Sequence, residues 1–237
     1  MTTQSEIQVA PSVAEEAPRS DPFALAGNSD RLPDYLLNPH AIEAEAIRAL
    51  RTRIIAQHVR EGRRALALCT PSAGSGCSYV AANLAAALAQ VDIKVALVDC
   101  DLRNPSVGPQ FGIAADHTGL ADYLDDDMIQ LDQIICESRV PGLAVIPAGY
   151  AAPNSQELLS GHRFRYLVSR LMREYELTLF DTTPANSCTD AQRVGTVAGY
   201  SLIVARKHQS YVNDAATLAK LLRADRSVVV GAVLNDY

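Results

Sequence analysis

Residues 71–79 of this 237-residue chain read PSAGSGCSY and have the composition of a phosphate-binding turn. The apolar run 65–70 precedes them and the helical stretch 80–89 follows. A strand, a glycine-rich turn and the first turn of a helix point successive backbone N–H groups into one concavity, which suits a di- or triphosphate. The candidate phosphate-binding residues are therefore Gly74, Ser75, Gly76, Cys77, Ser78 and Tyr79.

The fixed positions of the phosphate-binding pattern GxxxxGK[ST] are only half present. Gly76 and Ser78 match, whereas Pro71 replaces the first glycine and Cys77 replaces the lysine. In that pattern the lysine reaches the β- and γ-phosphates and the Ser/Thr hydroxyl binds Mg²⁺, so Ser78 is a candidate metal ligand. A thiol at a helix start is either a neutral replacement or a thiolate that would repel a polyphosphate. On the loop alone, a turn that binds no nucleotide explains the pattern equally well.

Three aspartates follow two other apolar segments. The segment 94–103 (KVALVDCDLR) carries Asp99 and Asp101, and alternation along a strand would place both on one face. The segment 175–184 (YELTLFDTTP) ends its apolar run at Asp181, in the form of a Walker B segment whose carboxylate holds Mg²⁺ through water. Taken singly, such an aspartate more often begins a loop or caps a helix. Together with the glycine-rich turn, the three aspartates favour a site for a nucleotide and Mg²⁺.

Strands alternate with helices along the chain, which predicts an α/β fold with a doubly wound, mainly parallel sheet. With 237 residues and 48% hydrophobic content, the chain is large enough for one full core. Ligands of such folds bind at the carboxyl ends of the strands, where all three motifs lie. We predict strands at 65–70, 95–99, 143–147, 177–181, 201–206 and 227–233, and helices at 78–90, 162–175, 187–198 and 212–224.

The first 34 residues differ in composition from the rest of the chain. They are rich in Pro, Ser, Ala and acidic residues, and Phe23 is the only aromatic residue before Tyr35. Such a segment cannot bury enough apolar surface to fold, so we predict a disordered arm at 1–34 and one nucleotide-binding domain at 35–237.

Composition also limits the class of partner. A net charge of −6 argues against nucleic-acid binding and against a polybasic membrane anchor. The sequence contains neither a signal-peptide pattern nor an apolar run of about 18 residues, so we expect a cytoplasmic protein without direct membrane insertion. The five cysteines fit neither a secreted disulfide framework nor a metal-ligand spacing, and we expect reduced thiols.

A further helix is predicted at about 39–59, before the first strand. Asn38 can cap it and Pro39 can take the first helical position. Glu45, Arg48 and Arg51 recur at intervals of three, which places them along one face. A solvated face with internal ion pairs explains this spacing without any partner.

The segment 98–105 (VDCDLRNP) resembles the second-aspartate motif of the bacterial tyrosine kinases (BY-kinases), which control exopolysaccharide chain length. The similarity runs from about Asn38 to the C-terminus and is greatest to the stand-alone chain-length-determinant tyrosine kinase subgroup. In that subgroup the loop tends to read GxGRSY, so an arginine already stands in place of the lysine. The resemblance implies a P-loop NTPase fold of the ParA/MinD-like type. Four more segments agree with it, namely 146–149 (IPAG), 153–159 (PNSQELL), 180–184 (FDTTP) and 231–235 (GAVLN).

The resemblance implies ATP and Mg²⁺ as cofactors of a protein-tyrosine kinase. Ser78, Asp99 and Asp181 would surround the metal ion. Asp101 would orient or deprotonate the phenol of the acceptor tyrosine, because an in-line transfer needs an oxygen held near the phosphorus. Asn235 would contact adenine.

The resemblance also implies partners. Glu45, Arg48 and Arg51 match the BY-kinase self-association motif ExxRxxR, in which this helix packs against the nucleotide site of a neighbouring subunit. A ring or other homo-oligomer is therefore expected. An inner-membrane polysaccharide chain-length determinant protein would be the second partner, and it would keep the chain peripheral to the inner membrane.

Two departures from the family leave three functions open. Cys77 removes the positive charge of the loop, and Tyr237 stands alone where familiar members carry a C-terminal tyrosine cluster. The first function is an active kinase that forms phosphotyrosine. The second is a catalytically weak scaffold that binds nucleotide and gates the membrane partner. The third is an ATPase switch of the ParA/MinD type, although that group has a lysine where this chain has Ser72.

Overall fold

The computed structural model describes residues 32–38 and 40–236. The predicted disordered arm lies outside these residues except for its last three, so the prediction of disorder stays untested. Of those three, Pro33 is buried and Asp34 begins the first helix.

The described part of the chain forms a seven-stranded sheet in the order β3-β4-β2-β5-β1-β6-β7. All neighbouring strands run parallel except β3, which pairs antiparallel with β4. This confirms the predicted doubly wound, mainly parallel α/β fold. The strands are β1 (Ala65–Cys69), β2 (Val95–Asp99), β3 (Cys136–Glu137), β4 (Leu143–Ile146), β5 (Leu177–Asp181), β6 (Tyr200–Arg206) and β7 (Val228–Asn235).

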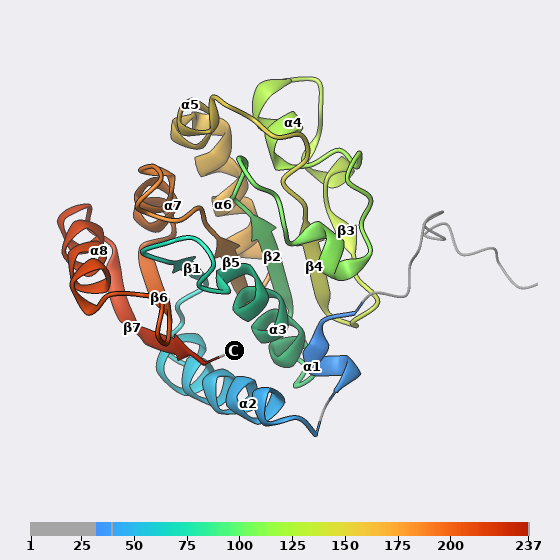
Figure 1. Cartoon of the computed structure of the whole chain (residues 1–237). Coiled ribbons are helices and arrows are strands. Elements are labelled where there is room, and N and C mark those ends of the chain that lie inside the picture. Colours follow the sequence, from blue (N-terminus) through green and yellow to red (C-terminus); the bar gives the residue numbers. More distant parts are fainter. Residues whose placement is uncertain (1–31, 39, 237) are drawn as a thin grey trace, which may run out of the picture.

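Helices cover both faces of the sheet (Figure 1). One face is covered by α1 (Asp34–Leu37), α2 (Ile42–Ile54) and α3 (Cys77–Ala89), and a π-helical turn at Ile55–Val59 continues α2. The other face is covered by α4 (Leu120–Asp125), α5 (Ser155–Ser160), α6 (His162–Glu174), α7 (Asp190–Ala198) and α8 (Val212–Ala224). Two short 3₁₀ turns lie at Gly108–Phe111 and Leu131–Gln133.

The central strands are buried at every position and mostly apolar, because helices cover both of their faces. In β1, Leu66 and Leu68 pack toward α3, while Ala65, Ala67 and Cys69 pack toward the opposite helices. Because successive side chains of a strand point to opposite faces, the residues of β1 contribute alternately to two separate cores. These cores fix the carboxyl end of β1, from which the glycine-rich loop departs.

Helix α6 illustrates how the sequence pattern specifies packing. Its buried residues are Phe164, Leu167, Val168 and Leu171, which is the spacing of a single apolar stripe on a helix. Phe164 meets Phe180 of β5 edge to face, with ring centroids 6.3 Å apart. This contact holds β5, and with it Asp181, against the helical layer.

The start of the helix predicted at about 39–59 was wrong. Helix α2 begins at Ile42 with Ala41 as its N-cap, and Asn38 is instead the C-cap of α1, where its backbone N–H donates to Asp34 O. Because α1 ends at Leu37 and Asn38 is its C-cap, Asn38 does not cap the next helix. Pro39 lies outside the described residues.

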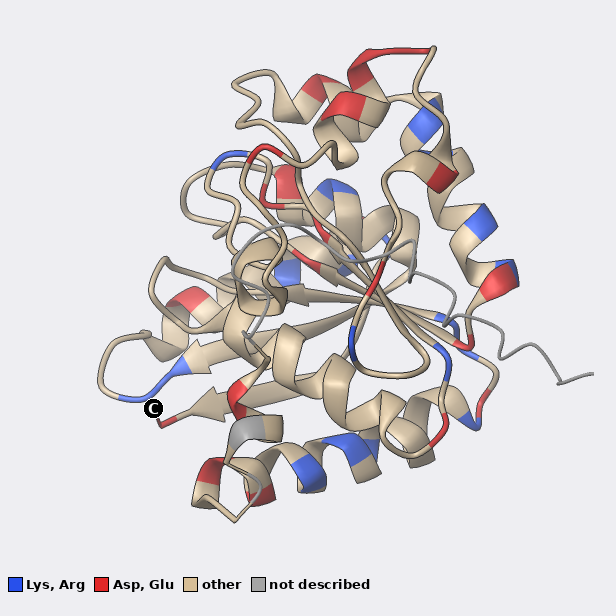
Figure 2. Ribbon diagram, turned by 90° about the vertical axis from the view of Figure 1, so that its right-hand side faces the viewer, with Lys and Arg blue, Asp and Glu red and all other residues tan. Residues whose placement is uncertain are grey.

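Charge is unevenly distributed along α2 (Figure 2). Its first turn carries Glu43 and Glu45, and its last turn carries Arg51 and Arg53. The N-terminus of a helix carries partial positive charge and its C-terminus partial negative charge, so acidic residues in the first turn and basic residues in the last turn stabilise α2 without any partner. Separately, no helix within 32–38 or 40–236 combines the length and apolar character that crossing a membrane requires.

Candidate functional site

The glycine-rich loop connects β1 to α3, and it turns left-handed at two positions. Gly74 has φ of 76° and Gly76, the N-cap of α3, has φ of 79°. Within the described residues, the backbone N–H groups of Gly74, Gly76, Cys77 and Ser78 donate to no protein acceptor. Such a row of unpaired donors at a helix start is a ready anion site, as the sequence predicts.

The carbonyl groups of the same loop are all held by the protein. Every carbonyl oxygen from Thr70 to Gly76 accepts a hydrogen bond, so the loop is fixed from its outer side. The donors, in chain order, are Ala185 N to Thr70 O (2.9 Å), Asn186 N to Pro71 O (3.1 Å), Ser75 Oγ to Ser72 O (2.5 Å), Gln209 Nε2 to Ala73 O (3.1 Å), Arg206 Nη1 to Gly74 O (3.0 Å), Asn235 Nδ2 to Ser75 O (3.0 Å) and Val80 N to Gly76 O (2.9 Å).

Asp99 and Asp181 occupy paired positions at the carboxyl ends of neighbouring strands, β2 and β5. Both are fully buried. The two oxygens of Asp99 accept hydrogen bonds from the backbone N–H groups of Asp101, Ser106 and Val107, at 3.0 to 3.1 Å. Neither oxygen of Asp181 has a partner among the described residues.

Burial and mutual repulsion shift the acidity of this carboxyl pair. Burial first, and the charge of Asp99 next, raise the pKa of Asp181 to about 8. The Ser78 hydroxyl and the Cys77 thiol lie close enough to oppose part of that shift. Burial also raises the pKa of Asp99 to about 6, against the opposing effect of its backbone N–H donors.

The site fits a divalent cation. Two unpartnered, buried oxygens on Asp181 beside a second carboxyl group and the Ser78 hydroxyl provide hard oxygen ligands. No group of three or more His, Cys, Asp or Glu residues gathers as metal ligands in the described chain. Mg²⁺ is the cation that the nucleotide site would hold. That ion is bound through one or two carboxylates, and phosphate and water complete its shell.

Asp101 lies beyond the end of β2, so the prediction that strand alternation places it on one face with Asp99 was wrong. Its Oδ1 accepts from the backbone N–H groups of Arg103 (3.2 Å) and Asn104 (2.9 Å). The side chain is buried, and burial raises its pKa in spite of those two donors. A raised pKa makes this carboxylate a stronger base than an exposed aspartate, which suits it to accept a proton.

Cys77 is a neutral thiol in this structure. It is 7% exposed, and its Sγ donates to Leu68 O at 3.4 Å. Burial, followed by the negative charge of Asp181, raises the pKa of the thiol well above its ordinary value. The alternative of an ionised thiolate at the helix start is therefore wrong, because desolvation and a neighbouring carboxylate outweigh the helix dipole here.

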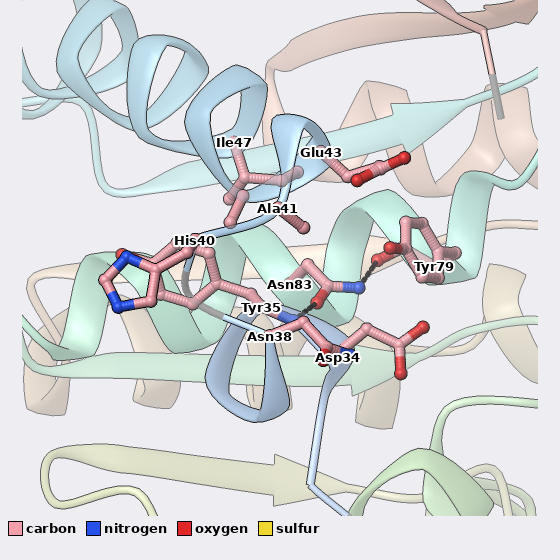
Figure 3. Close-up of a pocket in the computed structure, with 10 residues that line it drawn as sticks. Asp34, Tyr35, Asn38, His40, Ala41, Glu43, Ile47, Tyr79 and Asn83 are labelled. Atoms are coloured by element: carbon pink, nitrogen blue, oxygen red, sulfur yellow. Dashed lines mark hydrogen bonds between the residues drawn. The ribbon is translucent and has the colours of Figure 1, made fainter.

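Tyr79 and Asn235 lie at two different edges of the loop. Asn235, at the end of β7, donates its Nδ2 to Ser75 O, and its contact with adenine stays a prediction. Tyr79 instead lines a pocket of about 600 Å³ between α1, α2 and α3 (Figure 3). There Asn83 donates to Tyr79 O and accepts from the backbone N–H of Tyr35, both at 2.7 Å.

The structure does not bring the three residues of the ExxRxxR motif to the carboxyl pair. Arg48 forms an ion pair with Glu45 of its own helix at 2.8 Å. Arg51 donates to Tyr35 Oη at 3.4 Å and to Ala87 O at 3.3 Å. Ala87 is in the last turn of α3, about 15 Å along that helix from Cys77 at 1.5 Å per residue. Both arginines thus make contacts within the chain, and self-association stays a prediction.

Two residues at the loop, Arg206 and Gln209, were not among those selected from the sequence. Arg206 ends β6, the strand beside β1, and Gln209 follows in the loop to α8. The sequence could have indicated Arg206 only through its position, because it is the last residue of a predicted strand at the edge of the sheet where ligands bind.

Comparison with known proteins shows which sequences this chain is similar to. Residues 64–226 match the protein family described as an AAA domain. Tyrosine-protein kinase wzc of Salmonella typhimurium is 33% identical over 84% of this chain, which spans only 27% of wzc. Tyrosine-protein kinase YwqD of Bacillus subtilis is 31% identical, and the match covers 84% of each chain.

Solved structures agree in fold. The kinase domain of Escherichia coli tyrosine kinase ETK superimposes with a TM-score of 0.81 at 31% identity, over 92% of this chain and 84% of that domain. The septum site-determining protein MinD of Pyrococcus horikoshii, solved with Mg-ADP, gives a TM-score of 0.64 at 21% identity, over 73% of this chain and 70% of that one. The second match bears on the fold alone, and it agrees with the predicted MinD-like architecture.

Proposed function

Since the chain belongs to the bacterial tyrosine kinase family, we propose that it is an ATP-dependent protein-tyrosine kinase. The observation that carries the proposal is the buried Asp99–Asp181 pair beside the glycine-rich loop. Its two unpartnered Asp181 oxygens lie where a cation would accompany a triphosphate. ATP supplies the phosphoryl group and a tyrosine phenol accepts it.

Different groups of the chain are proposed to bind the phosphates, the metal ion and adenine. The backbone N–H groups of 74–78 bind the phosphates, and Ser78, Asp99 and Asp181 would hold Mg²⁺. A bound Mg²⁺ would supply positive charge that neutralises the charge developing on the phosphates during transfer. Asn235, at the opposite edge of the loop, would contact adenine.

Asp101 is the proposed proton acceptor. As the phenol oxygen bonds to the γ-phosphorus, the bond between that phosphorus and its bridging oxygen breaks, and ADP leaves with the electron pair. The phenol proton passes to the Asp101 carboxylate. The backbone N–H groups of Arg103 and Asn104 hold one oxygen of that carboxylate, which fixes its orientation toward the acceptor.

The biological setting follows from the family. We propose that the kinase regulates exopolysaccharide or capsule chain length together with an inner-membrane chain-length determinant protein. It would be cytoplasmic, peripheral to the inner membrane through that partner, and a homo-oligomer assembled through Glu45, Arg48 and Arg51.

A second candidate function is supported by Cys77. The thiol is buried against Leu68 O and carries no positive charge toward the phosphates. Loss of a lysine that makes charge-assisted hydrogen bonds lowers binding or transfer by about ten- to a hundredfold. A weak kinase that binds nucleotide and gates its membrane partner is the alternative this residue favours.

Calorimetry with Mg-ATP, combined with phosphotyrosine detection, separates the two functions. We expect the wild type to bind Mg-ATP and Cys77→Lys to bind about ten- to a hundredfold more tightly. Cys77→Ala is the matched control, because it removes the thiol without adding charge. Phosphotyrosine that Asp101→Ala abolishes supports the kinase, and binding without phosphotyrosine supports the scaffold. A wild type and a Cys77→Lys variant that both fail to bind would exclude the nucleotide site.

A further inference from the structure

We infer that Arg206 and Gln209 are positioning residues of the phosphate loop, which act on a phosphate ligand through the backbone. They hold two successive carbonyl groups on the outer side of the loop, so that the N–H groups that follow face the concavity. The inference deepens the proposed function and rests on it, because it concerns how this loop binds the phosphates of a nucleotide.

The planarity of the peptide bond makes the mechanism specific. In a trans peptide the carbonyl of one residue and the N–H of the next point in opposite directions. Gln209 Nε2 donates to Ala73 O at 3.1 Å and so directs the N–H of Gly74 inward. Arg206 Nη1 donates to Gly74 O at 3.0 Å and so directs the N–H of Ser75.

Asn235 continues the series on the next peptide. Its Nδ2 donates to Ser75 O at 3.0 Å and directs the N–H of Gly76. Three consecutive peptides are therefore oriented by three side chains from the β6 and β7 side of the loop. We call Arg206, Gln209 and Asn235 the carbonyl clamp.

The clamp also accounts for the two glycines. A Cβ atom at Gly74 would lie 2.7 Å from Gln209 Nε2, and one at Gly76 would lie 2.4 Å from Asn235 Nδ2. Real Cβ atoms do not approach neighbours so closely. Gly74 and Gly76 are thus needed to admit the clamp as well as to adopt left-handed φ.

The carbonyl clamp contributes more to phosphate binding in this chain than it would beside a lysine, because Cys77 supplies no positive charge. Phosphate binding then depends on backbone N–H donors, and their strength depends on orientation. Donors that are already oriented lose less entropy when a ligand arrives. A loop without the clamp would retain the same donors and bind phosphate more weakly.

Variants at Arg206 and Gln209 test the inference, with Mg-ADP as the probe. Asn235 is left intact because of its proposed adenine contact. We expect Arg206→Ala and Gln209→Ala each to weaken Mg-ADP binding about three- to tenfold, and the double variant about ten- to a hundredfold. Arg206→Lys, which keeps a positively charged N–H donor group, is expected to restore most of the affinity lost in Arg206→Ala. Lys207→Ala is the matched control, since Lys207 is the next cation along the chain and pairs with Asp236 at 2.7 Å.

A second measurement distinguishes positioning from general stabilisation. ¹⁵N relaxation of the Gly74 and Gly76 amides in the ligand-free protein reports loop order directly. We expect these amides to become more mobile in the double variant while its melting temperature stays within about 3 °C of the wild type. Unchanged affinity together with unchanged amide order in the double variant would overturn the inference. A wild type that does not bind Mg-ADP would count against the proposed function, and the relaxation data would still decide for or against the clamp.

Discussion

Asp181 is the residue whose chemical state depends most on what occupies the site. It is buried beside a second carboxyl group, and its raised pKa of about 8 means that it holds a proton at neutral pH in the ligand-free protein. A cation would reverse the repulsion between the two groups and release that proton. Binding of metal and loss of a proton are thus coupled at this position.

Asp181→Asn should therefore change how stability depends on pH. The unfolded aspartate has a pKa near 3.9, and the folded one is raised to about 8. The folded state binds the extra proton between these values, so its contribution to stability is complete below about pH 4 and is lost as pH rises to 8. We expect Asp181→Asn to be more stable than the wild type at pH 8, by roughly 5 kcal/mol because each unit of raised pKa corresponds to about 1.4 kcal/mol, and to differ by about 1 kcal/mol or less at pH 4.5.

Thermal melts in the presence of a chelator, from pH 4.5 to 8.5, measure this difference. Asp116→Asn, at an exposed position, is the control for removing one negative charge. Parallel pH profiles for the wild type and Asp181→Asn would contradict the raised pKa.

The sequence indicated which acidic residues end the strands, but not their hydrogen bonding or protonation. Asp99 and Asp181 were selected because each ends an apolar strand, and the structure places both there. Their different hydrogen bonding was not predictable, because it depends on the path of the loop at 101–107. The outer contacts of Arg206 and Gln209 were missed for the same reason, since a side chain that binds a backbone carbonyl leaves no motif.

At the scale of elements, the long periodic segments were predicted well. All six predicted strands and all four core helices are present, with ends that differ by up to three residues. Strand β3 has only two residues, and α1 has only four, so neither is long enough to produce a hydrophobic period. Helices α4 and α5 were missed because six residues span less than two turns.

The junction between α4 and the segment after β4 depends on one close backbone approach. A Cβ atom at Gly119 would lie 2.2 Å from Gly149 N and 2.4 Å from Pro147 O. The N–H groups of Leu120 and Ala121 donate to this same segment at 2.8 Å. A side chain at Gly119 would therefore separate a helix from the sheet.

We expect Gly119→Ala to lower the free energy of unfolding by about 2–4 kcal/mol, because the clashing atoms belong to the backbone and cannot move alone. Chemical denaturation of the purified variant measures this change. Gly231→Ala is the control, since its nearest atom would lie 3.9 Å away. Equal destabilisation by both substitutions would show that the close approach has no special cost.

At the scale of the whole molecule, the fold followed from the alternation of strands and helices, whereas the assembly did not. Arg48 pairs with Glu45 on the surface of α2, while Arg51 is tied to α1 and α3 through Tyr35 and Ala87. Arg48 also lies over the Tyr35 ring, with its Cζ 6.0 Å from the ring centroid, so both arginines of the motif contact α1 of their own subunit.

We expect Arg48→Ala to weaken self-association and to lower the melting temperature only slightly, because the ion pair with Glu45 and the contact with the Tyr35 ring each contribute little to stability. Arg51→Ala should weaken association and also lower the free energy of unfolding by about 1 kcal/mol, through loss of its intramolecular hydrogen bonds. Sedimentation velocity and thermal melts on the same samples measure the two effects. Arg53→Ala, an exposed cation outside the motif, is the control. A wild type that is monomeric at every concentration would remove the basis for both expectations.

The order of strands has a consequence for biosynthesis. Strand β1 lies between β5 and β6, and its first residue, Ala65, pairs with Thr178. A ribosome therefore releases an entirely apolar strand, with every residue destined for the interior, long before either neighbour has been translated. Pairing of such distant segments is slow, and unpaired apolar strands aggregate. The nascent chain should thus depend on chaperones until β5 and β6 emerge, and its nucleotide loop can acquire its shape only after that point.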